Sequence, residues 1–101
     1  MALVKVKAGV KPELLVIVAA LANVAQDTHD VAQIVITSGT DGKHMEGSKH
    51  DTGEAIDVRT RNFPSTQAIY TFAVKMRRRL GANYQVIIER DHIHVEYDPL
   101  V

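Results

Sequence analysis

Two segments of this chain have hydrophobic residues in patterns that are typical of helices. Residues 12–26 are a nearly unbroken apolar run that begins with Pro12 and Glu13, and proline and acidic residues are both favoured in the first turn of a helix. A later apolar series, spaced three or four residues apart as on one helix face, consists of Ile69, Phe72, Met76 and Leu80. Ser65 before this series is a preferred N-cap, and Gly81 after it is a preferred stop. The pattern therefore predicts two helices.

Four shorter segments are rich in β-branched and aromatic residues, as strands are. They are QIVIT (33–37), AIDVR (55–59), YQVIIE (84–89) and HIHVEY (92–97). Only Arg90 and Asp91 separate the last two, which predicts a tight antiparallel hairpin. Residues 39–53, in contrast, are polar and punctuated by glycine, as functional loops often are. We therefore expect an α+β fold with two helices packed on a small, mainly antiparallel sheet.

Composition limits the kinds of site that this chain can carry. Its 101 residues, 46% of them hydrophobic, suffice for one core but not two, so we expect a single domain over residues 1–101. Twelve basic and twelve acidic residues balance one another, and the chain therefore lacks the positive charge with which proteins attract nucleic acid. The absence of cysteine excludes disulfides, thiolate nucleophiles and cysteine zinc sites. A metal ion would need histidine and carboxylate ligands.

The apolar run near the N-terminus has some features of a secretory signal. Lysines precede it, and small residues lie near its end. The run is too short to span a bilayer, and its loss would remove the largest apolar segment of a small core. We therefore favour a buried helix over a cleaved signal and expect no membrane insertion.

Three of the five histidines lie beside aspartates in two short segments, HDTGEAID (50–57) and DHIH (91–94). Residues two apart on a strand share a face, so His92 and His94 should project to the same side. Gly53 allows a sharp turn that could bring His50 of the loop over Asp57 of the strand. Two histidine nitrogens and one carboxylate oxygen are a common ligand set for catalytic zinc. The same side chains could equally line a solvated polar cleft, and their spacing leaves both interpretations open.

The first of these segments also resembles a known motif. SKHDTGEAIDVR (48–59) matches the pattern Ser-x-His-x-x-Gly-x-Ala-x-Asp of the LAS-type zinc peptidases, a family of D-alanyl-D-alanine carboxypeptidases, D-Ala-D-Ala dipeptidases and phage L-alanyl-D-glutamate endolysins. DHIHVE (91–96) resembles the second motif of the family, and IVITSG (34–39) resembles the strand that leads to the first. The resemblance extends from about Pro12 to Asp98. It implies a fold like that of the D-Ala-D-Ala peptidases and of Hedgehog signalling domains, which share the metal arrangement.

Position by position, the resemblance implies a bound Zn²⁺ with His50, Asp57 and His94 as its ligands. It gives Asp91 the role of the catalytic carboxylate that takes a proton from water and delivers it to the leaving amine. It gives His92 the role of opposing negative charge on the scissile carbonyl oxygen. Asp91 shares the side of the histidines only if it lies in the turn, because strict alternation would point it away.

Glu89 is the alternative general base if the hairpin is longer than its sequence predicts. The chain also departs from the family in the loop after the first strand, where many members carry an arginine for a substrate carboxylate or carbonyl. Here the loop reads TDGKHMEGSK (40–49), and lysine is a poorer partner than arginine for two parallel hydrogen bonds. Lys43 and Ser48 are our candidate substrate-binding residues. Arg59 and Arg61 leave the far end of the second strand.

The resemblance therefore implies a zinc-dependent peptidase that cleaves a bond involving a D-amino acid in the stem peptide of bacterial peptidoglycan. It would act as a D-Ala-D-Ala carboxypeptidase or as an L-Ala-D-Glu endopeptidase. The small size suits a monomeric phage or prophage lysis enzyme that stays in the cytoplasm until another factor opens the membrane. The alternative is a non-catalytic zinc-binding module with the same fold, serving structure or recognition.

Overall fold

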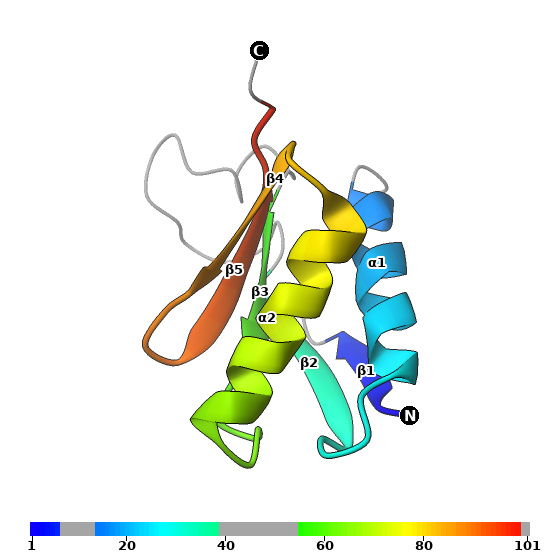
Figure 1. Ribbon diagram of the computed structural model, residues 1–101, viewed down its shortest axis with the longest axis vertical. Helices are drawn as coiled ribbons and strands as arrows, with labels where there is room; N and C mark the ends of the chain where they lie inside the picture. Colours follow the sequence, from blue (N-terminus) through cyan, green and yellow to red (C-terminus); the bar gives the residue numbers. More distant parts are fainter. Residues whose placement is uncertain (7–13, 39–54, 100–101) are drawn as a thin grey trace.

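The computed structural model of this chain describes residues 1–6, 14–38 and 55–99. Its elements are β1 (Leu3–Val6), α1 (Leu15–Gln26), β2 (Gln33–Ser38), β3 (Ala55–Arg59), α2 (Thr66–Leu80), β4 (Tyr84–Ile88) and β5 (His92–Tyr97). The strands form one sheet in the order β1-β2-β3-β5-β4, and both helices lie on the same side of it (Figure 1). Only the pairing of β1 with β2 is parallel among these strands. The expected α+β class, with two helices on a mainly antiparallel sheet, is confirmed.

The core lies between the helices and one face of the sheet. Alternate strand residues are fully buried on this side, namely Ile34, Ile36, Ile56, Val58, Ile93 and Val95. The helices contribute Ile17, Leu21, Phe72 and Met76, and the ring of Phe72 packs edge-on against Phe63 at 5.5 Å between centroids. Because residues two apart on a strand share a face, the residues between these buried ones belong to the face that the helices leave uncovered.

Helix α2 begins and ends where its sequence predicts. The Ser65 hydroxyl accepts a hydrogen bond from the backbone N–H of Ala68 at 3.1 Å, which is the N-cap contact expected of serine. At the other end Gly81 has a positive φ of 87°, a conformation that glycine adopts without strain, and its N–H bonds to the carbonyl oxygen of Arg77. Helix α1 covers the described part of the predicted first helix, whereas Pro12 and Glu13 lie outside the described residues.

The hairpin of β4 and β5 has the short turn that the sequence predicts. The N–H of Glu89 donates to the carbonyl oxygen of His92 at 2.8 Å, which leaves Arg90 and Asp91 as the two turn residues. Asp91 therefore lies in the turn, as required for it to share the side of the histidines.

Strand β1 was not predicted. It has four residues, LVKV, three of them exposed, and runs parallel to β2 at the edge of the sheet. So short and exposed a segment lacks the alternation that marks a half-buried strand. No helix in the described part of the chain is long and apolar enough to cross a membrane.

Candidate functional site

The face of the sheet that the helices leave uncovered carries the polar residues of both motifs. In the antiparallel register of β3 and β5, Asp57 lies directly opposite His94, and Arg59 lies opposite His92. Side chains directly opposite one another on antiparallel strands are neighbours on the same face. The register therefore brings together two segments that lie 37 residues apart in the sequence.

His94 lies between two carboxylates. Its Nδ1 is 2.9 Å from Oδ1 of Asp57, and its Nε2 is 3.0 Å from Oε1 of Glu96. Ionised carboxylates can only accept hydrogen bonds, so both ring nitrogens donate when both partners are charged. The hydrogen bond to Asp57 is the largest cause that raises the pKa of His94, and Glu96 adds to it, while burial acts in the opposite direction. In the metal-free protein His94 is therefore stabilised as an imidazolium.

His92 is held by the neighbouring turn residue. Its Nδ1 donates to Oδ1 of Asp91 at 2.6 Å, and its Nε2 lies 3.7 Å from Oδ1 of Asp57. The hydrogen bond from His92 is the largest cause that lowers the pKa of Asp91. The Asp91 side chain is 81% exposed, so solvent water reaches its carboxylate. Oδ1 of Asp57 is consequently approached by a nitrogen from each of the two histidines.

Asp57 and His94 are joined by a hydrogen bond, and their separation is slightly shorter than that of two ligands of one zinc ion. Two atoms each bound at 2.0–2.1 Å to a tetrahedral zinc lie about 3.3 Å apart, and the observed distance between Nδ1 and Oδ1 is 2.9 Å. Metal-binding histidines commonly donate their second N–H to a carboxylate, and Glu96 accepts from Nε2 of His94 in this way. With a small increase in this distance, Asp57 and His94 could act as two ligands of one zinc ion, with Glu96 as an outer carboxylate.

The third predicted ligand, His50, lies outside the described residues, as do the candidate substrate-binding residues Lys43 and Ser48. Within the described ranges, no group of three or more His, Asp or Glu side chains is arranged to hold a metal ion. The described part of the chain thus contains two of the three predicted ligands.

A hollow of about 230 Å³ opens beside His92. It is lined by Thr37, Asp57, Arg59, Arg61, Asp91 and His92. Four of the predicted site residues are described, and the hollow contains three of them, while His94 is joined to it through Asp57. The structure therefore brings Asp57, Asp91, His92 and His94 close together, as the sequence predicts for these four residues.

Sequence reasoning gave no role to four residues of this region, namely Thr37, Arg59, Arg61 and Glu96. Glu96 could have been found by continuing the alternation from His92 and His94 along the same strand. Arg59 could have been found in the same way from Asp57. Arg61 lies beyond the end of β3, where alternation no longer predicts the side on which a residue lies. The alternative role of Glu89 as the general base required a longer hairpin, whereas the turn has only two residues.

Comparison of the chain with protein-family models, with curated proteins and with solved structures found no match.

Proposed function

We propose that this chain is a zinc-dependent peptidase that hydrolyses a peptide bond involving a D-amino acid in the stem peptides of bacterial peptidoglycan. The observation that carries the proposal is the direct pairing of Asp57 with His94, with His92 and Asp91 beside them. These four residues come from the two motifs that resemble those of the LAS-type peptidases. The substrate class rests on that resemblance, and the chemistry rests on the side chains themselves.

Zinc binding would use Oδ1 of Asp57 and Nδ1 of His94, with His50 as the predicted third ligand. When bound, zinc supplies a Lewis acid that acidifies water and polarises a carbonyl group. Nδ1 of His94 must lose its proton to serve as a ligand. Glu96 continues to accept a hydrogen bond from Nε2, so it holds the ring in the tautomer and orientation that ligation needs.

Asp91 and His92 would act as a pair during hydrolysis. The hydrogen bond from Nδ1 of His92 keeps Asp91 ionised, because it lowers the pKa of that carboxylate. An ionised and exposed Asp91 can accept a proton from water and pass it to the leaving amine. The same hydrogen bond fixes the ring of His92 with Nε2 toward Asp57, where a protonated Nε2 can donate to the carbonyl oxygen as negative charge develops on it.

Purified cross-linked peptidoglycan tests the proposed function. The sequence lacks the loop arginine that would hold a terminal carboxylate, so we expect cleavage inside stem peptides, seen as zinc-dependent solubilisation with new amino termini and little free D-alanine. Ordinary all-L peptides should remain intact. His29→Ala is a matched control because His29 contacts the N-terminal amine, far from the motifs in the sequence.

The products separate the alternatives. Release of D-alanine without new internal amino termini would indicate a carboxypeptidase. Failure of a fully zinc-loaded protein to cleave any wall fragment would refute the peptidase and favour the non-catalytic module.

A further inference from the structure

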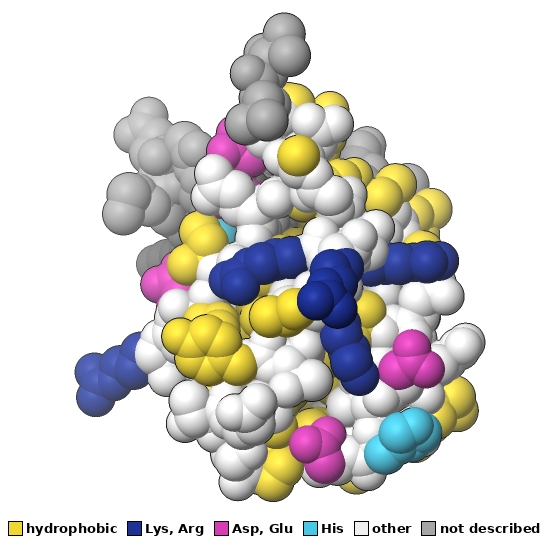
Figure 2. All heavy atoms as spheres, in the orientation of Figure 1, with side chains coloured by type: hydrophobic (Ala, Val, Ile, Leu, Met, Phe, Trp, Pro, Cys, Tyr) yellow, Lys and Arg dark blue, Asp and Glu magenta, His cyan; other side chains and the backbone are white. Residues whose placement is uncertain are grey.

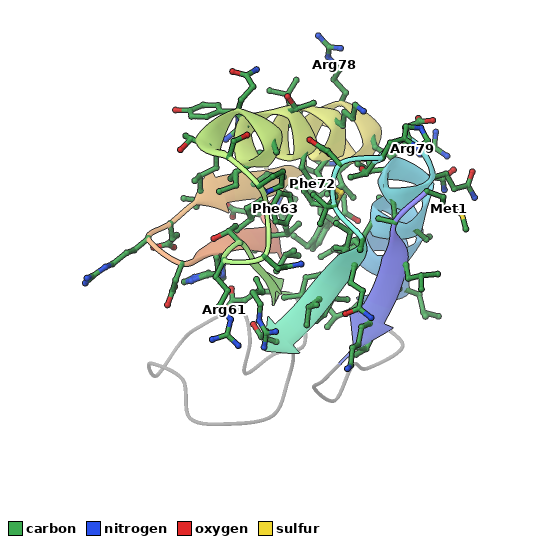
Figure 3. The ribbon with its side chains drawn as sticks, turned by 90° about the horizontal axis from the view of Figure 1, so that it is seen from below. Met1, Arg61, Phe63, Phe72, Arg78 and Arg79 are labelled. Atoms are coloured by element: carbon green, nitrogen blue, oxygen red, sulfur yellow. The ribbon has the colours of Figure 1, made fainter. Side chains whose placement is uncertain are left out.

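Two arginines border the hollow next to His92. Arg59 ends β3 directly opposite His92, and paired residues of antiparallel strands have Cβ atoms about 4.5–5.5 Å apart. Arg61 follows two residues later and lies on the side of the sheet away from α2 (Figure 3). Both line the hollow together with Asp57, Asp91 and His92. Two guanidinium groups thus lie at the proposed reaction site.

These arginines have no evident part in holding the described fold together. Arg77 illustrates a structural arginine, because its Nε and Nη2 donate to the carbonyl oxygen of Val86 at 3.1 and 2.8 Å and thereby tie α2 to β4. In the part of the chain that the structure describes, no carboxylate forms an ion pair with Arg59 or Arg61. Their charges are therefore available to a bound anionic group.

The acidic side chains of the hollow are already engaged. Asp57 accepts a hydrogen bond from His94, and Asp91 accepts one from His92. An anionic group entering the hollow would therefore meet two guanidinium groups and two carboxylates that already accept hydrogen bonds. The planar fork of arginine binds a carboxylate through two parallel hydrogen bonds. At about 230 Å³ the hollow is smaller than a drug-sized site, so it suits one acidic residue of a peptide.

We propose that Arg59 and Arg61 bind a carboxylate that the substrate carries next to its scissile bond. The proposal rests on the proposed peptidase function and specifies which stem peptides the site takes. A C-terminal residue and a D-glutamate linked through its side-chain carboxyl both carry a free α-carboxylate beside the scissile amide. Since we expect cleavage inside stem peptides, the D-glutamate is the residue that we assign to the two arginines. The two arginines of this chain would then supply the guanidinium group that residues 40–49 lack.

A pair of matched peptides tests the proposal. Both contain L-alanine joined to side-chain-linked D-glutamate, one with a free α-carboxylate and the other with an α-carboxamide. The scissile amide is N-methylated in both, so that binding is measured without turnover. Calorimetric titration of the full-length, zinc-loaded protein should show that the carboxylate peptide binds about tenfold more tightly, or better, as expected for charge-assisted hydrogen bonds.

Variants locate this preference. Arg59→Gln and Arg61→Gln should each reduce it, and the double variant should remove it. Arg61→Lys should retain part of the preference, because it keeps the charge and loses the fork. Arg78→Gln is the matched control. This variant also removes one positive charge, but from α2, where Figure 2 shows Lys and Arg side chains gathered. Arg78 and Arg61 lie on opposite sides of the sheet (Figure 3). Arg78→Gln should therefore leave the preference for the carboxylate peptide unchanged.

The outcomes separate this site from the peptidase activity. Equal binding of the two peptides, binding of neither, or an effect of Arg78→Gln as large as that of Arg61→Gln overturns the proposal. A carboxylate preference that depends on the two arginines supports it even if no wall fragment is hydrolysed, in which case only the peptidase is refuted. Hydrolysis of wall fragments without any preference leaves the peptidase intact and refutes the arginine site.

Discussion

Glu96 offers the sharpest test of the proposed metal site, because its carboxylate touches a predicted ligand without being one. Its Oε1 accepts from Nε2 of His94 at 3.0 Å, and the side chains of Glu96 and His94 are only 18% and 15% exposed. Solvent therefore replaces this contact poorly when the carboxylate is removed. Substitution of Glu96 should weaken zinc binding while the predicted ligands stay in place.

Two substitutions divide the effect into charge and hydrogen bond. Loss of such outer partners weakens metal affinity by about 10–100-fold. Glu96→Gln keeps an acceptor oxygen and loses the charge, so we expect the lower limit, about tenfold or 1.4 kcal/mol. Glu96→Ala loses both, so we expect the upper limit, about 100-fold or 2.8 kcal/mol. Since Glu96 also favours the protonated ring that competes with metal, both losses should be smaller at acidic pH.

Competition between the protein and a chromophoric chelator measures these affinities. Glu89→Gln is the matched control, because Glu89 is an exposed carboxylate on the same hairpin and is not a partner of Nε2 of His94. Thermal melting of the metal-free variants checks that they fold. If both Glu96 variants kept wild-type zinc affinity at neutral and alkaline pH, Nδ1 of His94 would not be the ligand.

Three further predictions concern ligation, catalysis and pH. The purified protein should hold about one zinc per chain, and His94→Ala should abolish tight binding by elemental analysis, so full zinc content in that variant contradicts the ligand set. Asp91→Asn should retain zinc and lose hydrolysis by roughly 100-fold or more, whereas Glu89→Gln should be mild in the same assay, and reversed effects would make Glu89 the base. The metal-free protein should melt at lower temperature as pH rises. The raised pKa of His94 gives stability that is complete below its unfolded pKa, about 6.5, and lost as pH rises through the folded value. A melting temperature that falls equally in His94→Gln would assign the trend to another group.

The sequence predicted the parts of this molecule that depend on local chemistry. Ser65 and Gly81 end α2 through their own side-chain and backbone properties, and the two-residue spacing of His92 and His94 fixes them on one face. The turn at Asp91 followed from the number of residues between two strands. Each of these features is determined within a few residues along the chain.

What the sequence did not predict depends on pairing between distant segments. The strand order places β5 between β3 and β4, and nothing within either motif specifies that Arg59 will lie opposite His92. Alternation along β5 places Glu96 beside His94, but the residue that the other ring nitrogen of His94 contacts, Asp57, comes from β3. The parallel edge strand β1 is stabilised by its neighbour β2, and its own four residues contain too little pattern to reveal it.

Because the site forms across the pairing of β3 with β5, it can form only when these two strands have paired. Asp57 and His94 are 37 residues apart, and all of α2 lies between them. Closing so long a loop is entropically costly, so their contact should form late, together with the long-range strand pairing. A partly folded chain with α2 already helical would hold neither the predicted ligand pair nor the arginine opposite His92. Partially folded molecules should consequently be inert rather than weakly active, and recovery of zinc binding during refolding should follow the formation of the sheet and not the earlier gain of helix.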